Sequence, residues 1–317
     1  MPKQTLALRS QQERKAARRS AGPLIDFRIA PATRKRYEVA VARYLSFLLA
    51  HARPWPQDCP EVDSTAAEFI QVLWEDGDPL SYATDMLSGL QFYAPPLKKN
   101  LPSSWQFITA WRKAELPARA TPFLPRYAAA VAGYFAQTSP TTSLAILVGF
   151  HCLLRTGEIL LLQWKHFELH VGHRVGVLVL PNTKSGNRTG TEESVVIDDV
   201  YLLELLVLHR SQSQPGDFLV AGTSGAFRKK LDEAVVNIPL PPGRWRPYSI
   251  RRGGATAHFR EHGSLDATAI RGRWQHVRTC RIYINDAMTT LAELAEEPDH
   301  KNVRKWQCFL SQRLRQV

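Results

Sequence analysis

The chain has 317 residues, of which 44% are hydrophobic and 22% are charged, and this composition excludes a largely disordered protein. Two domains are expected at this length, because one hydrophobic core rarely organises so long a chain. The formal net charge of +12 favours a polyanionic partner. No apolar stretch reaches the roughly 20 residues that cross a bilayer, so we expect nucleic acid and no membrane.

The first 30 residues form a polar, basic segment without the apolar core of a secretory signal, so we expect an intracellular protein. A flexible arm that folds on contact with DNA and a solvated tail are equally consistent with residues 1–30. The four cysteines of the chain stand far apart without paired metal spacing, so neither a structural zinc nor a disulfide is expected. The arm's cations are Arg9, Arg14, Lys15, Arg18 and Arg19.

Residues 31–116 predict a helical domain. Apolar residues recur at helical spacing in each of its segments, and Pro and Gly separate the segments. The predicted helices begin at Thr33 and lie near residues 64–76, 80–93 and 103–115.

The first of these helices carries Arg34, Lys35 and Arg36 in its opening turn, and we assign these cations to DNA binding. Residues 116–125 hold three prolines and no period, which is typical of an interdomain linker. The domain boundary is therefore predicted between residues 116 and 117.

Residues 117–290 predict a second domain with strands as well as helices. Helical patterns at residues 126–136 and 144–164 precede two β-branched runs that flank an Asn-, Gly- and Ser-rich turn. Helical patterns resume after Val200, and residues 291–317 form a C-terminal helical tail. The predicted fold class is mainly α with a small antiparallel β-sheet.

Two arginine motifs are candidates for chemistry. Arg155 and Glu158 lie three residues apart after an apolar helix: they form either a structural salt bridge or a pair in which Glu158 orients Arg155 toward a phosphate. In the string that begins at Tyr248, Arg251 and Arg252 precede two glycines, which would let a backbone approach a ligand closely, and we assign Arg252 to DNA binding.

Two further motifs complete the set. Lys184 lies on the predicted hairpin turn, where it is either a solvated loop lysine or a proton donor that reaches into a cleft. Tyr283 follows Trp274 by nine residues among several arginines, and such cations favour a phenolate, although a tyrosine at helical spacing is commonly a core residue.

Taken in chain order, these motifs resemble the tyrosine recombinase and phage integrase family, whose motifs run Arg, hairpin Lys, His-x-x-Arg, His or Trp, and Tyr. The resemblance covers about residues 125–287 as a catalytic domain, and residues 31–116 look like the family's helical, SAM-like core-binding domain. It assigns the motif positions to Arg155, Lys184, Arg251, Trp274 and Tyr283.

One position departs from the family pattern, because Tyr248 stands where the family most often has His. Its ordinary pKa of about 10 makes it a poor general base near neutral pH. His276 is a minor candidate for the missing imidazole, although the spacing assigns the His or Trp position to Trp274. With the Arg-Gly-Arg-Trp and Tyr-Ile-Asn-Asp strings, this departure looks more like recombinases of eukaryotic mobile elements than common bacterial ones.

The resemblance implies a site-specific DNA recombinase or integrase. Arg155 and Arg251 would stabilise the charge on the phosphate oxygens, and Trp274 would donate one more hydrogen bond. Lys184 would protonate the departing 5′ oxygen, and Tyr283 would hold the DNA as a 3′-phosphotyrosyl ester. The ester conserves the energy of the broken bond, so no metal and no cofactor are expected.

Two other functions stay open: a type IB topoisomerase-like enzyme that relaxes DNA, and a noncatalytic DNA-binding protein derived from a recombinase. The expected partners are double-stranded DNA and further copies of the chain, assembled as a tetramer on DNA. The expected compartment is the nucleus in a eukaryote and the cytoplasm with its nucleoid otherwise.

Overall fold

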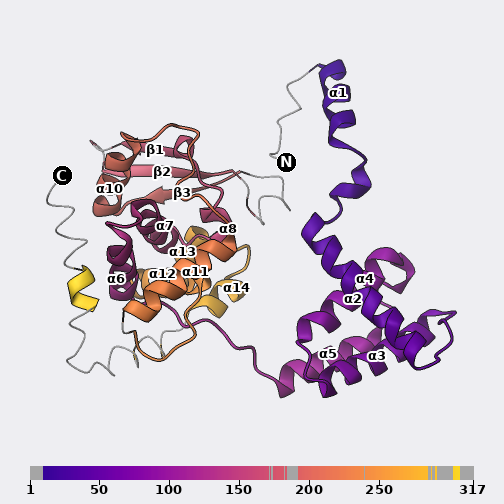
Figure 1. Ribbon diagram of the computed structural model, residues 1–317. Coiled ribbons are helices and arrows are strands. Elements are labelled where there is room, and N and C mark those ends of the chain that lie inside the picture. The colour runs from indigo at the N-terminus through magenta and orange to yellow at the C-terminus, as the bar shows by residue number, and fades with distance from the viewer. Residues whose placement is uncertain are drawn as a thin grey trace. The chain divides into compact units, whose positions relative to one another are not determined.

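The computed structural model describes residues 10–170, 172, 174–181, 183, 192–238, 240–284, 287, 290 and 303–307. The chain divides into two compact units, of which the amino-terminal unit ends at Ala118 and the carboxyl-terminal unit begins at Arg119. Each unit has its own hydrophobic core. Figure 1 labels the helices and strands that build each unit. No helix within the described ranges is long and apolar enough to cross a membrane.

The amino-terminal unit is helical. Asp63, buried in the third of its α-helices, accepts hydrogen bonds from the main-chain N–H groups of Ser103 and Ser104 at 2.9 Å, and so fixes the start of the last helix. Its elements are α1 (Gln11–Ala21), η2 (Leu24–Phe27), α2 (Pro31–Ala50), α3 (Cys59–Glu75), α4 (Leu80–Tyr93), η3 (Pro95–Leu97) and α5 (Pro102–Ala114).

Helix α1 was not predicted from the sequence. The Ser10 hydroxyl accepts a hydrogen bond from the Glu13 amide, and the Glu13 carboxylate accepts one from the Ser10 amide. This capping box was the available sequence signal. None of residues 11–21, all of which the structure describes, is buried.

The carboxyl-terminal unit combines helices with a small antiparallel sheet, so the predicted fold class is confirmed. In the described residues the sheet order is β1-β2-β3, with Phe167 opposite Leu178 and Val177 opposite Val196. The strands are β1 (Phe167–His170), β2 (Val175–Leu180) and β3 (Glu193–Ile197). Strand β1 was not predicted, because four residues are too few to show a period of two.

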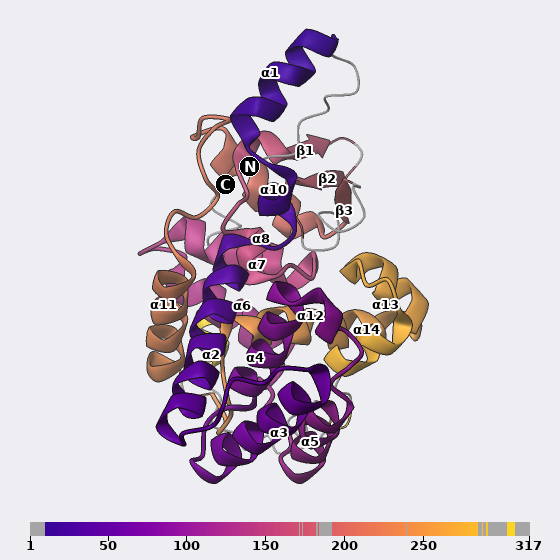
Figure 2. The same cartoon turned by 90° about the vertical axis from the view of Figure 1, so that its right-hand side faces the viewer.

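Helix α12 lies at the centre of the helical part of this unit and packs against α6, α7, α13 and α14. Figure 2 shows α13 and α14 side by side. The helices are α6 (Pro125–Phe135), α7 (Pro140–His151), α8 (Thr156–Ile159), α10 (Val200–Arg210), α11 (Ser224–Asn237), α12 (Pro247–His262), α13 (Leu265–Gly272) and α14 (Val277–Tyr283), with the 3-10 turn η4 (Trp164–His166).

The two glycines of α12 serve packing within the chain. A Cβ atom on Gly254 would lie 2.0 Å from the Phe150 carbonyl oxygen of α7, and one on Gly253 would lie 2.1 Å from the Phe123 carbonyl oxygen. The sequence suggested that these glycines admit a ligand. In the structure they admit the backbones of α7 and of the segment before α6.

Residues 303–307 are the described part of the predicted tail. They are helical, Val303 is buried in the core of the carboxyl-terminal unit, and the Trp306 ring lies 5.2 Å from the Tyr134 ring. Gly133 of α6 approaches the Trp306 backbone so closely that a Cβ atom would lie 2.1 Å from its carbonyl oxygen. This part of the tail therefore packs on its own unit.

Candidate active site

A buried carboxylate organises the candidate site. Glu158 of α8 is 4% exposed and accepts hydrogen bonds from Arg155 at 2.6 Å and from Arg273 at 2.8 Å. Arg251 lies 3.6 Å from the same carboxylate. Burial alone would raise the pKa of Glu158. The charge of Arg273, the Arg155 amide and the charge of Arg251 outweigh burial and lower the pKa, so the carboxylate stays ionised.

Arg251 is 0% exposed and lies in α12 between the other elements of the site. Its guanidinium donates hydrogen bonds to the carbonyl oxygens of Leu153 and, at 2.7 Å, Gly272. Burial and the nearby Arg155 lower its pKa to about 10, so it remains charged at neutral pH. Its Nε atom is buried and has no acceptor among the described residues.

Two aromatic rings lie at the face of this guanidinium, and a third lies against one of them. The carbon at its centre lies 4.6 Å from the centre of the Trp274 ring and 5.3 Å from the centre of the Tyr283 ring. The Trp274 and Tyr283 ring centres are 4.5 Å apart, and those of Tyr248 and Tyr283 are 5.3 Å apart. Arg251, Trp274, Tyr248 and Tyr283 therefore form one cluster.

The two tyrosines of the cluster differ in acidity. Tyr248 is 42% exposed, and the part of its ring that is buried against the cluster, together with the interaction with Tyr283, raises its pKa above the ordinary value. Burial would also raise the pKa of Tyr283, but the Tyr248 hydroxyl and the charge of Arg251 outweigh it and lower that pKa. Of the two hydroxyls, that of Tyr283 is therefore the one that favours the phenolate, and that of Tyr248 is the one that keeps its proton.

Solved structures with the same arrangement of elements identify the fold. The chain matches the Tn1549 transposon integrase in complex with transposon right end DNA, with a TM-score of 0.58 and 14% identity over 90% of this chain and 99% of that one. It matches a lambda integrase dimer bound to a core site with a TM-score of 0.52 and 14% identity, over 81% and 77% of the two chains. The chain has the tyrosine recombinase fold. No protein-family model and no curated protein matches the chain.

Within this recombinase fold, five residues predicted from the sequence come together: Glu158 contacts the two arginines, and the three aromatic residues cluster beside Arg251. The five are Arg155, Tyr248, Arg251, Trp274 and Tyr283. Lys184, the predicted hairpin lysine, lies outside the described residues. His276 is the N-cap residue of α14, and its carbonyl oxygen accepts hydrogen bonds from the Thr279 and Cys280 amides. Its side chain is exposed.

Arg273 is a site residue that the sequence did not single out. Its side chain is buried and joins Glu158 at 2.8 Å to Glu193 of β3 at 3.5 Å. It also donates to the carbonyl oxygens of Cys152 at 3.1 Å and Leu153 at 3.3 Å. The available sequence signal was its position directly before Trp274, but the motif pattern has no arginine at that position. Its backbone lies in the left-handed region, with a φ of 57°.

The three cations of α2 that were assigned to DNA binding differ in exposure and in their ion pairs. Helix α2 begins at Pro31 rather than Thr33, so Lys35 and Arg36 lie in its second turn, where both are exposed. Arg36 lies 3.6 Å from Asp85, and Arg34 pairs with Asp26 at 3.1 Å. Their DNA binding stays a prediction.

Arg252, also assigned to DNA binding, is 3% exposed. It donates to the carbonyl oxygen of Ala120 and, at 3.4 Å, to that of Tyr283. Two of its guanidinium nitrogens are thus bonded within the chain, and its DNA binding stays a prediction.

Proposed function

We propose that this protein breaks and rejoins double-stranded DNA as a site-specific recombinase. One observation carries the proposal: the Nε atom of Arg251 and the Nε1 atom of Trp274, both beside the Tyr283 ring, are buried without an acceptor in the described part of the chain. An unsatisfied buried donor costs about 1–3 kcal/mol. The nonbridging oxygens of a phosphodiester would supply the acceptors.

In the proposed reaction the Tyr283 oxygen attacks the phosphorus, and the bond between phosphorus and the 5′ oxygen breaks. Arg251 and Arg155, which is 28% exposed, would stabilise the added charge on the nonbridging oxygens. Lys184 would give a proton to the 5′ oxygen. Attack by a 5′ hydroxyl on the 3′-phosphotyrosyl ester reverses these steps and rejoins the strand.

Tyr248 takes a role that a histidine base would not have. Its raised pKa keeps its proton in place, so it cannot accept the proton of Tyr283. It stabilises the Tyr283 phenolate by a hydrogen bond instead, and the proton of Tyr283 passes to water.

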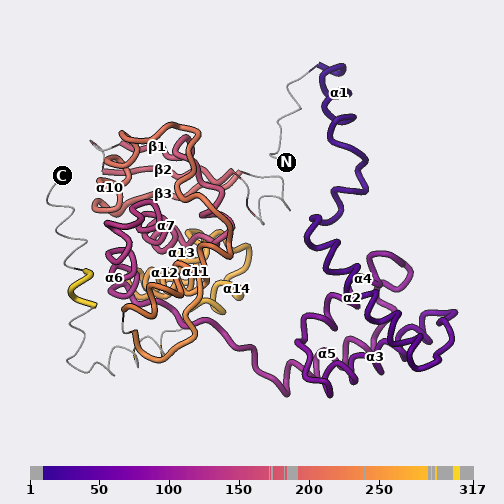
Figure 3. The backbone as a smooth tube through the Cα atoms, viewed as in Figure 1, coloured from indigo at the N-terminus to yellow at the C-terminus, as the bar shows by residue number. Residues whose placement is uncertain are grey.

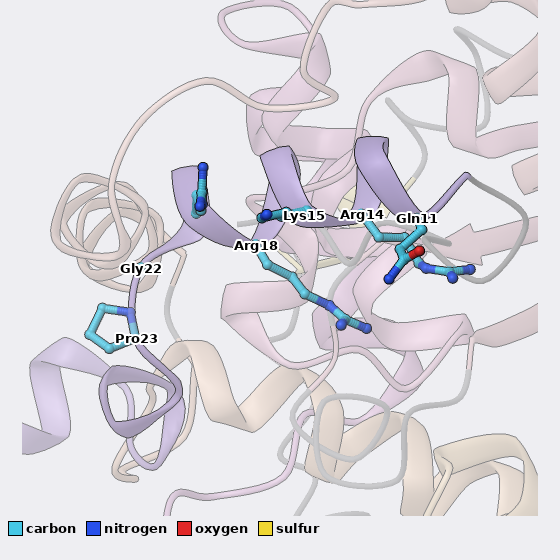
Figure 4. A pocket seen from close by; sticks show the side chains of 7 residues that line it. Gln11, Arg14, Lys15, Arg18, Gly22 and Pro23 are labelled. Atoms are coloured by element: carbon cyan, nitrogen blue, oxygen red, sulfur yellow. The ribbon is translucent and has the colours of Figure 1, made fainter.

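Helix α1 is proposed as a further DNA contact. Figure 4 shows the side chains of Arg14, Lys15 and Arg18 on this helix. Arg14 and Arg18 lie four residues apart, as do Lys15 and Arg19, and like charges at this spacing destabilise a helix. DNA phosphates would relieve that repulsion. Assembly of several copies on one DNA completes the proposal, because strand exchange needs more than one nucleophile.

The test is covalent capture. Duplexes bound by the Tyr283→Phe protein are selected from a random pool, and the selected sequence is built into a nicked suicide substrate, from which the 5′ hydroxyl fragment diffuses away. The native protein should form an adduct that survives denaturation, and Tyr283→Phe should form none. An adduct that persists in Tyr283→Phe would exclude Tyr283 as the nucleophile.

Two arginine variants separate catalysis from binding. Arg155→Ala and Arg251→Ala should each lose far more cleavage rate than DNA affinity, because oxyanion donors typically contribute about 100-fold or more to rate. Equal losses in both measurements would indicate a DNA-binding protein without catalysis. Relaxation of a plasmid without recombination between two selected sites would indicate a topoisomerase.

A further inference from the structure

The segment that joins the two units is fixed to the carboxyl-terminal unit from Arg119 onward. Residues 116–124 form neither helix nor strand, and their path can be followed in Figure 3 between α5 and α6. The Thr121 N–H donates to the Arg244 carbonyl oxygen at 3.0 Å, and the Phe123 N–H donates to the Ser249 carbonyl oxygen at 3.1 Å. Residues 119–124 therefore lie on the start of α12, and we call them the seated linker.

Side-chain packing holds the seated linker as closely as its hydrogen bonds do. The Phe123 ring is buried and stacks on the Trp245 ring with centres 5.0 Å apart and planes 12° apart. The Phe123 backbone lies where a side chain on Gly253 would be, because a Cβ atom there would come within 2.8 Å of the Phe123 nitrogen. A glycine at position 253 is thus required for this contact.

Arg252 lies directly beside that contact and joins the seated linker to the nucleophile. One nitrogen of its guanidinium donates to the Ala120 carbonyl oxygen, and its Nε donates to the Tyr283 carbonyl oxygen at 3.4 Å. Arg119, in the linker itself, donates to the Ile282 carbonyl oxygen at 3.5 Å. The last carbonyl oxygens of a helix have no partner within it, and cations are favourable there, so both arginines stabilise the end of α14.

We infer that Arg252 is a positioning residue that ties the backbone of Tyr283 to the seated linker, so that Tyr283 is placed for attack only while the linker lies on α12. The inference rests on the proposed function, because it assigns a role in the cleavage step. Besides joining the two units, the linker then affects the chemistry, because a displacement of residues 119–124 is transmitted through one guanidinium to the nucleophile. A misplacement of about 1 Å in a reacting group can cost on the order of 100-fold in rate.

Three variants test this role with the suicide substrate. Arg252→Gln removes the paired donors, and Arg252→Lys keeps the charge but lacks the planar fork that reaches two carbonyl oxygens. Gly253→Ala displaces the linker without changing a charge. The control is Arg271→Gln, because Arg271 likewise donates to a main-chain carbonyl oxygen of a distant segment, that of His151 at 3.0 Å.

At saturating protein, Arg252→Gln and Arg252→Lys should both cleave on the order of 100-fold more slowly than the native protein, with DNA affinity and the pH midpoint of cleavage unchanged. Arg271→Gln should cleave at the native rate. The double variant of Arg252→Gln and Gly253→Ala should be about as slow as the slower single variant, since both act through the linker.

Hydrogen exchange provides a measurement independent of cleavage. In Arg252→Gln the amides of Thr121 and Phe123 should exchange faster than in the native protein, while the melting temperature shows that the protein is folded. If Gly253→Ala fails to fold, the exchange measured in Arg252→Gln still tests whether Arg252 holds the linker.

Four results would overturn the positioning role: full rescue by Arg252→Lys, additive effects in the double variant, unchanged exchange at residues 119–124, or a loss of DNA affinity as large as the loss of cleavage. The last would make Arg252 a phosphate contact. Failure of the native protein to form an adduct would instead overturn the proposed function, and the exchange of the linker amides would still report whether Arg252 holds the linker.

Discussion

The hydroxyl of Tyr248 controls the acidity of its neighbour. Burial would raise the Tyr283 pKa, but the nearby Tyr248 hydroxyl and the charge of Arg251 outweigh it and lower that pKa. In Tyr248→Phe the donor is lost, so the Tyr283 pKa should rise. Cleavage that increases with pH should then have its midpoint at higher pH and be slower near neutrality.

The measurement is the rate of adduct formation as a function of pH, with Tyr248→His as the comparison. A histidine supplies an imidazole base at this position, so Tyr248→His should cleave at least as fast as the native protein near pH 7. An unchanged midpoint in Tyr248→Phe would show that the two hydroxyls do not interact during cleavage.

Glu158 is the residue on which the stability of the site depends most. In Glu158→Gln the buried guanidinium groups lose their shared counter-charge, and the free energy of unfolding should fall by about 3–5 kcal/mol, as measured by urea denaturation. Glu193→Gln is the matched control, since Glu193 pairs with Arg273 alone among the described residues, and it should lose less.

The contribution of Glu158 should also be visible in the pH dependence of the free energy of unfolding. The Glu158 pKa is lowered from its ordinary 4.5 in the folded protein, since its arginine neighbours outweigh burial. The carboxylate therefore contributes stability that is fully present above pH 4.5 and is lost as the pH falls through the lowered folded-state value. Glu158→Gln should flatten this acid limb of the stability curve.

At the scale of elements, we expect the cations of helix α1 to contribute to the salt dependence of DNA binding. Each phosphate contact contributes roughly 0.9 to the slope of log affinity against log salt concentration. Changing Arg14, Lys15, Arg18 and Arg19 to Gln should therefore reduce that slope by up to about 4 without changing the cleavage rate at saturation.

Replacing the three arginines of α1 by Lys is the control, because it keeps the charge and should keep the slope. A slope that is the same in the Gln variant would show that α1 does not contact DNA. Helix content measured with and without DNA should rise on binding only in the charged forms.

For the whole molecule, the separate cores predict separable unfolding. Leu87 lies in the core of the amino-terminal unit and Leu206 in that of the carboxyl-terminal unit, and both are fully buried. Leu87→Ala and Leu206→Ala should each lower the stability of their own unit by about 2–5 kcal/mol. Urea denaturation followed by circular dichroism should then show two transitions, of which each variant shifts one; a single transition shifted by both would contradict this.

The features that could be predicted from the sequence are those that depend on residues close together in the chain. Local patterns were sufficient for α4, whose predicted bounds of 80–93 are those observed, and for the linker, where Pro117 and Pro122 lie in the non-helical segment and Pro125 begins α6. The motif order placed Arg155, Arg251, Trp274 and Tyr283 in one site.

Other features depended on contacts between distant segments, which a pattern in one segment does not show. Gly253 and Arg252 are adjacent, yet their roles follow from Phe123, Ala120 and Tyr283, which come from other parts of the chain. Helix α3 begins at Cys59 rather than near residue 64, because Asp58 caps it with a hydrogen bond from the Glu61 amide.

Under the proposed function, the charge balance around Glu158 links the stability of this protein to DNA binding. Three guanidinium groups, of Arg155, Arg251 and Arg273, face the two carboxylates of Glu158 and Glu193, so the cluster retains a buried positive charge. A phosphate that binds only the folded state neutralises this excess and adds to the free energy of unfolding. Copies bound at a DNA site should therefore outlast unbound copies under proteolysis, so that the cell clears the recombinase fold wherever it has no site to occupy.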